Sequence, residues 1–158
     1  MHVILATDAD WLIDEVVAAL GGPETSFTVC REGRKVAGLV EDRTPDLVIL
    51  DMQIGTMGGV AVTMDLRLDE SAGTLPHVPI LMLLDRDVDV HLARRSGSDG
   101  WLVKPLDSLR LRRASRAIAA GGCYAEGLPE TPVEAPVETA GEASETDQAP
   151  AEETVDAG

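Results

Sequence analysis

Short apolar runs alternate with helix-like segments through residue 122 of this chain, and this alternation is what most limits the folds open to it. Five runs have the length and composition of buried strands, at residues 2–7, 26–30, 47–51, 79–84 and 100–103. After each run, apolar residues recur at the spacing of amphipathic helices, and Gly121 and Gly122 close the last helix. Alternating strands and helices predict an α/β domain built on a parallel sheet.

Right-handed crossovers between such units restrict the topology further. We expect a flavodoxin-like, doubly wound, five-stranded parallel sheet in the order 2-1-3-4-5, with helices on both faces. In the helix after the third strand, Val60, Met64 and Leu68 mark the apolar face.

The charge of the chain divides it into two regions. Residues 1–125 contain all 13 Lys and Arg and 18 of the 28 acids, whereas residues 126–158 contain 10 acids and no base. The second region is rich in Pro, Ala, Thr and Glu, and it cannot bury enough apolar surface to offset the entropy cost of ordering. We therefore expect a folded domain at residues 1–121 and a disordered acidic tail at residues 122–158.

Composition also argues against several classes of protein. A net charge of −15 disfavours contact with phosphate backbones, so nucleic-acid binding is not expected. No signal segment and no long apolar run is present, which favours a cytoplasmic protein without membrane contact. Cys30, Cys123 and the three histidines lack the spacing of zinc ligands or of a disulfide framework.

Polar residues follow three of the predicted strands. Asp8 comes after the first strand, Asp51 ends the third, and Lys104 with Pro105 follows the fifth. The proposed strand order brings these carboxyl ends together. Two carboxylates suit Mg²⁺, and a lysine can hold a phosphoryl oxygen. Alternatively, Asp51 only caps the turn that follows it.

These residues resemble the receiver domain of two-component response regulators over residues 1–121. Residues 45–51, PDLVILD, are similar to the strand that carries the family's phosphoacceptor aspartate. Gly59 matches the glycine that closes the next loop, and residues 97–105, GSDGWLVKP, match the stretch that ends in the family's lysine and cis proline. The order and spacing of these pieces make the resemblance specific.

The resemblance implies a role for each site residue. Asp51 would accept a phosphoryl group from a phosphohistidine or a small phosphodonor, forming an aspartyl phosphate. Asp8, Asp51 and the backbone carbonyl of Gln53 would hold Mg²⁺, and Lys104 would stabilise the phosphoryl oxygens. Pro105 is the cis-proline candidate.

Several positions depart from the family pattern. Thr7 stands where the family has the first of two tandem acids, so we expect a weakened magnesium site. Leu84 replaces a Thr or Ser hydroxyl, and Asp85 replaces a small residue, which puts the usual switch in doubt. Trp101 fills the place of the switch aromatic, or is a buried tryptophan without a signalling role.

The leading expectation is a stand-alone receiver in a phosphorelay that acts through protein–protein contacts. Its catalysis would be limited to its own phosphorylation and dephosphorylation at Asp51. The expected partners are a histidine kinase or phosphotransfer protein, and a downstream protein or second copy. The downstream contact would use the helices from Val88 to Arg95 and from Leu106 to Ala120, whose arginines face solvent or contact the acidic tail.

Two other classes remain open. A pseudo-receiver would keep the fold and signal without phosphorylation, as Thr7, Leu84 and Asp85 suggest. An unrelated α/β enzyme fits less well. Haloacid-dehalogenase phosphatases need a second aspartate where this chain has Gln53, and the anionic loop at residues 7–10 would repel a flavodoxin's cofactor phosphate.

Overall fold

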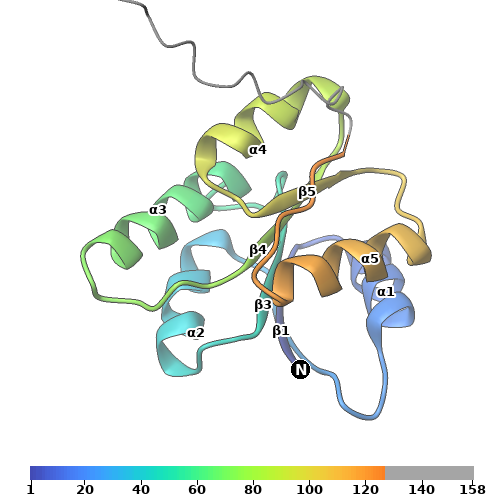
Figure 1. Ribbon diagram of the computed structural model, residues 1–158, viewed down its shortest axis with the longest axis horizontal. Helices are drawn as coiled ribbons and strands as arrows, with labels where there is room; N and C mark the ends of the chain where they lie inside the picture. Colours follow the sequence, from blue (N-terminus) through green and yellow to red (C-terminus); the bar gives the residue numbers. More distant parts are fainter. Residues whose placement is uncertain (127–158) are drawn as a thin grey trace, which may run out of the picture.

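The computed structural model describes residues 1–126, in which strands and helices alternate around a five-stranded parallel sheet (Figure 1). The sheet order is β2-β1-β3-β4-β5, which confirms the predicted fold class and topology. The strands are β1 (His2–Ala6), β2 (Ser26–Cys30), β3 (Leu47–Asp51), β4 (Ile80–Leu84) and β5 (Gly100–Val103). The helices are α1 (Asp10–Leu20), α2 (Val36–Asp42), α3 (Gly59–Ser71), α4 (Val90–Ser96) and α5 (Ser108–Ala119).

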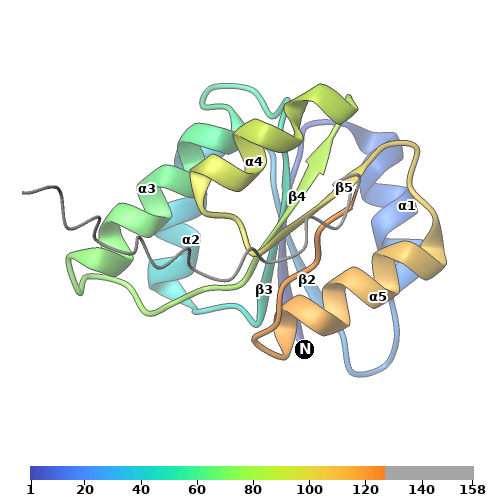
Figure 2. The same cartoon turned by 45° about the horizontal axis from the view of Figure 1, so that its top comes forward.

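Helices cover both faces of the sheet. Helices α1 and α5 lie on one face, and α2, α3 and α4 lie on the other (Figures 1 and 2). In β3, Leu47 and Ile49 pack in the cluster with α1 and α5, while Val48 and Leu50 pack in the cluster with α2 and α3. In a strand that is buried on both faces, polar and apolar residues do not alternate. This explains the continuous apolar runs of the sequence.

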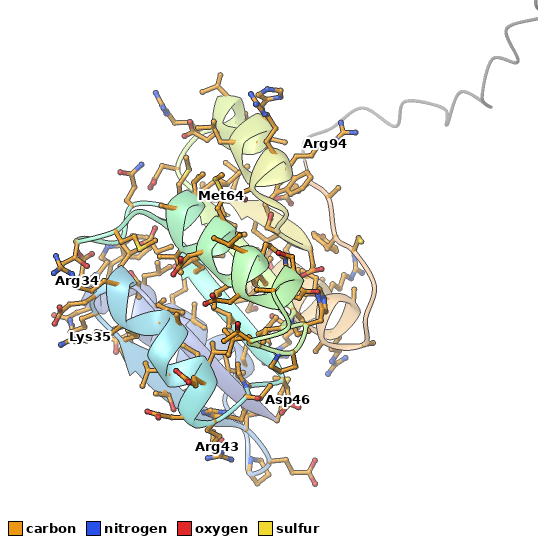
Figure 3. The ribbon with its side chains drawn as sticks, turned by 90° about the vertical axis from the view of Figure 1, so that its left-hand side faces the viewer. Arg34, Lys35, Arg43, Asp46, Met64 and Arg94 are labelled. Atoms are coloured by element: carbon orange, nitrogen blue, oxygen red, sulfur yellow. The ribbon has the colours of Figure 1, made fainter. Side chains whose placement is uncertain are left out.

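Helix α3 buries a different face from the predicted one. Its buried residues include Val62 and Leu66, whereas Met64 is 57% exposed and Leu68 66% exposed. Met64 is labelled on α3 in Figure 3. The start of the helix explains the rotation, because a Cβ on Gly59 would lie 2.8 Å from the carbonyl oxygen of Asp51. This close approach of the helix to β3 turns Val62 and Leu66 toward the sheet.

The exposed side chains of Met64 and Leu68 border an open hollow of about 620 Å³ between α3 and α4. Its lining combines the apolar side chains of Met64 and Leu68 with charged Arg95, and it lies apart from Asp51.

Two helices of the second half begin later than predicted. Helix α5 starts at Ser108, because the Asp107 carboxylate accepts hydrogen bonds from the backbone N–H groups of Leu109 and Arg110 and so caps the helix. Helix α4 starts at Val90 after a single 3₁₀ turn at Asp87–Asp89.

The folded part extends beyond the predicted boundary at residue 121. Residues 122–126, called the C-terminal clip below, run along the edge of β5, where Tyr124 pairs with Gly100. The backbone N–H of Trp101 donates to the Tyr124 carbonyl at 3.0 Å. The predicted tail includes residues 122–126, whereas in the structure the edge of β5 offers Tyr124 hydrogen-bond partners. From residue 127 on, the predicted disordered tail lies outside the described residues.

Loss of the clip is expected to destabilise the domain. A chain that ends at Gly121 should be less stable than one that ends at Glu126 by about 2 kcal/mol, because several part-buried hydrogen bonds are lost. Urea unfolding monitored by circular dichroism measures the difference. Equal unfolding midpoints would show that the clip contributes nothing to stability.

No helix within residues 1–126 is long and apolar enough to span a membrane.

Candidate functional site

The carboxyl ends of β1, β3 and β5 carry the polar residues of the site. Ala6 of β1 lies beside Leu50 of β3 in the sheet register, so the residues that follow the two strands are neighbours. Asp51 is the last residue of β3, and Lys104 directly follows β5. The structure therefore brings together side chains that are far apart in the sequence.

The Asp51 carboxylate is buried, with only 2% of the residue exposed, and both of its oxygens accept hydrogen bonds. Lys104 Nζ donates to Oδ1 at 2.8 Å, and the backbone N–H of Gln53 donates to the same oxygen at 3.1 Å. The Thr7 hydroxyl donates to Oδ2 at 2.8 Å. These contacts fix the orientation of the carboxylate, and Lys104 compensates its charge.

Asp8 lies at the solvent-exposed side of the same edge. The backbone N–H of Gly55 donates to Asp8 Oδ2 at 3.3 Å, which directs this carboxylate toward the loop after β3. Within residues 1–126 no group of three or more His, Cys, Asp or Glu side chains could hold a metal ion. The site thus offers two carboxylates, a set that fits Mg²⁺, because this ion keeps several water ligands.

Lys104 is shared between two carboxylates. Its Nζ lies 2.8 Å from Asp51 Oδ1 and 3.1 Å from Asp85 Oδ1. The ring of Trp11, on α1, lies beneath the same ammonium group with its centroid 5.7 Å away. Both contacts hold the lysine over the site.

Comparison with known proteins decides the family. Residues 3–116 match the response regulator receiver domain. The chain belongs to the response regulator receiver family. The DNA-binding response regulator MtrA of Mycobacterium tuberculosis is 33% identical over 117 residues, which cover 72% of this chain and 49% of that protein. The chain spans about half the length of the curated relatives it matches.

Solved structures share the receiver fold. The chemotaxis response regulator CheY4 of Vibrio cholerae has a TM-score of 0.65 at 21% identity, with 74% of this chain and 97% of that chain covered. The receiver domain of a Pseudomonas aeruginosa sensor histidine kinase has a TM-score of 0.64 at 20% identity, with 75% and 97% covered. That protein was solved with a magnesium ion in its active-site cleft.

Leu84 is the last residue of β4, and Asp85 directly follows it. Leu84 is fully buried and packs in one cluster with Val90 and Trp101, so it contributes to the core and offers no hydroxyl. Asp85 turns toward the site and pairs with Lys104 while its side chain stays 38% exposed.

Trp101 is a buried residue, only 5% exposed, and its indole N–H donates to the backbone oxygen of Glu126 at 2.7 Å. The Lys104–Pro105 peptide bond is cis, in agreement with the expectation for Pro105.

Three contacts of this site were not anticipated from the sequence. The Thr7 hydroxyl binds Asp51, Trp11 lies against Lys104, and Glu126 binds Trp101. The position of Thr7 beside Asp8 hinted at the first contact. No spacing or motif points to the other two.

Proposed function

We propose that this receiver domain accepts a phosphoryl group on Asp51 from the phosphohistidine of a histidine kinase or phosphotransfer protein. The observation that supports the proposal is the Asp51 carboxylate itself, held by Lys104, Thr7 and the Gln53 N–H at the carboxyl edge of the sheet. The signal then passes to another protein through contacts of the domain. The relative MtrA is named a DNA-binding regulator, so the proposal concerns the receiver part alone.

The chemistry needs few groups. A carboxylate oxygen of Asp51 attacks phosphorus, and the new P–O bond forms as the P–N bond to the donor imidazole breaks. Lys104 stays beside the carboxylate and interacts with the charge on the phosphoryl oxygens. Asp8, Asp51 and the Gln53 carbonyl would hold Mg²⁺, which when bound supplies further positive charge to those oxygens. With Thr7 at the first of the two tandem acidic positions, the magnesium site is weaker than a site with three acids.

A second candidate is a pseudo-receiver that signals without phosphorylation. The contact between Asp85 and Lys104 favours it, because it places a negative charge next to the incoming phosphoryl group. Buried Leu84 favours it as well, since no hydroxyl can report the modification.

Incubation with acetyl phosphate and Mg²⁺, followed by intact mass, tests the two candidates. One added phosphoryl group per chain supports the phosphorelay function. An unmodified protein, also after exposure to a panel of phosphorylated kinases, supports the pseudo-receiver.

Removal of the Asp85 charge is expected to speed phosphorylation. In Asp85→Ala, Lys104 no longer divides its charge between two carboxylates, and repulsion of the phosphodonor falls. We expect a rate about 3- to 10-fold higher, which corresponds to roughly 1 kcal/mol of transition-state free energy. The measurement is the rate of phosphoryl incorporation from acetyl phosphate.

Asp87→Ala is the matched control, because Asp87 is an exposed acid of the adjoining turn. An equal increase in both variants would show a general charge effect, and a decrease in Asp85→Ala would contradict the inhibitory role.

A further inference from the structure

The edge of β5 that faces away from β4 is covered by the chain itself. An edge strand presents unpaired N–H and C=O groups that can pair with another strand. Here the C-terminal clip occupies the edge, and Figure 2 shows it running beside β5. The Tyr124 N–H donates to the Asp99 carbonyl at 3.1 Å, and the Tyr124 carbonyl accepts from the Trp101 N–H at 3.0 Å.

Glu126 is the anchor of the clip. Its carboxylate accepts from the Val103 N–H at 3.1 Å and forms an ion pair with both the Nε and an Nη of Arg110. The side chains of Glu126 and Arg110 are 25% and 33% exposed, so the pair is partly shielded from solvent. A two-point contact between guanidinium and carboxylate is among the more specific ion pairs in proteins.

Arg110 also binds two backbone carbonyl groups, which help to orient its guanidinium. Its guanidinium donates to the carbonyl oxygens of Val103 and Pro105, both at 3.1 Å. The hydrogen bond with Glu126 raises the pKa of Arg110 above its usual value, because the carboxylate stabilises the charged guanidinium. The edge therefore offers backbone groups of β5, an indole N–H and an oriented guanidinium, and in this structure the clip binds all of them.

The clip follows Gly121, and Gly122 is its first residue. Gly121 has a left-handed φ of +86°, and the only strand bridge of the described clip is the one between Gly100 and Tyr124. A short segment that follows a glycine of this kind can detach from the β5 edge while the five strands of the sheet stay paired.

We propose that the β5 edge is a docking site for an extended, glutamate-bearing segment of a partner protein, and that the C-terminal clip is its built-in competitor. The partner pairs with the edge by strand addition, and its carboxylate takes the place of Glu126 on Arg110. The clip shows which groups the site binds: the extended backbone of Tyr124 and the carboxylate of Glu126. Because Glu126 also holds the indole of Trp101, exchange of the clip for a partner changes the surroundings of this tryptophan. The proposal does not depend on phosphorylation of Asp51.

The test measures binding of a labelled peptide to the full chain, and no phosphodonor is added. The probe is a fluorescein-labelled peptide with the sequence of residues 121–126, with Ser in place of Cys123, and its binding is measured by fluorescence polarisation. Glu126→Gln weakens the clip and frees the edge, so the peptide should bind this variant about tenfold more tightly than the wild type. The amide of Val103 should exchange faster in the same variant.

Controls separate the carboxylate contact from general effects. Glu41→Gln removes an exposed acid on α2 and should bind the peptide like the wild type. In the Glu126→Gln background, Arg110→Lys keeps the positive charge but loses the two-point contact of the guanidinium. It should weaken peptide binding about tenfold. A peptide that ends in Gln should show the same loss.

Three outcomes would overturn the proposal. They are equal peptide affinity in wild type and Glu126→Gln, unchanged exchange at Val103, or a concentration-dependent dimer of Glu126→Gln that blocks the peptide. The last outcome would make a second copy of the chain the occupant of the edge.

Discussion

Asp51→Asn is expected to abolish phosphoryl incorporation completely, from both acetyl phosphate and a phosphorylated kinase. The amide is neutral and a poor nucleophile, so no acyl phosphate can form at this position. Its volume matches that of the carboxylate, and the hydrogen bonds from Lys104, Thr7 and the Gln53 N–H can still reach the amide oxygen in part. Intact mass after incubation with Mg²⁺ and donor measures the effect.

Asp8→Asn is the matched control for charge. It removes one carboxylate from the same edge but leaves Asp51, so phosphorylation should be slower and still reach one group per chain. Peptide mapping of the wild-type product locates the group. Modification of Asp8 or Asp85 that persists in Asp51→Asn would contradict the assignment of Asp51 as acceptor.

Thr7→Asp is expected to make the stability of the domain depend strongly on magnesium. Thr7 is fully buried, and its hydroxyl lies 2.8 Å from Asp51, so an aspartate there faces a buried like charge. Without Mg²⁺ the variant should lose about 2–4 kcal/mol of unfolding free energy. With Mg²⁺ at about 100 times its dissociation constant, binding returns about 2.7 kcal/mol. Thermal unfolding over a magnesium titration measures both effects.

Thr7→Val separates the lost hydrogen bond from the added charge. It keeps the shape of the side chain and removes the hydroxyl, so it should cost about 1–2 kcal/mol with little change in the magnesium response. If Thr7→Asp binds Mg²⁺ no more tightly than the wild type, Thr7 does not lie beside the ion.

The strand order and the meeting of the polar residues could be predicted from the sequence for a simple reason. Continuous apolar runs identify strands buried on both faces, and parallel strands with right-handed crossovers place all carboxyl ends at one edge. Asp51 ends such a run, and Asp8 and Lys104 each directly follow one, so a local pattern was enough to bring them together.

The buried face of α3 could not be read from spacing, because two apolar stripes of the helix fit the helical period equally well. Val60, Met64 and Leu68 form one stripe, and Val62 with Leu66 forms the other. The choice between them was made by the contact of Gly59 with the end of β3, which sets how the helix is rotated on the sheet.

The sequence by itself thus determined the fold class, the order of the strands and the residues that stand at the carboxyl edge, because each depends on local periodicity and on general rules of chain connection. Only the tertiary structure decided that Asp85 shares Lys104 with Asp51, and that Glu126 holds both Trp101 and Arg110. These are contacts between single side chains on different elements. Their geometry depends on how helices and strands pack, and no pattern of neighbouring residues records it.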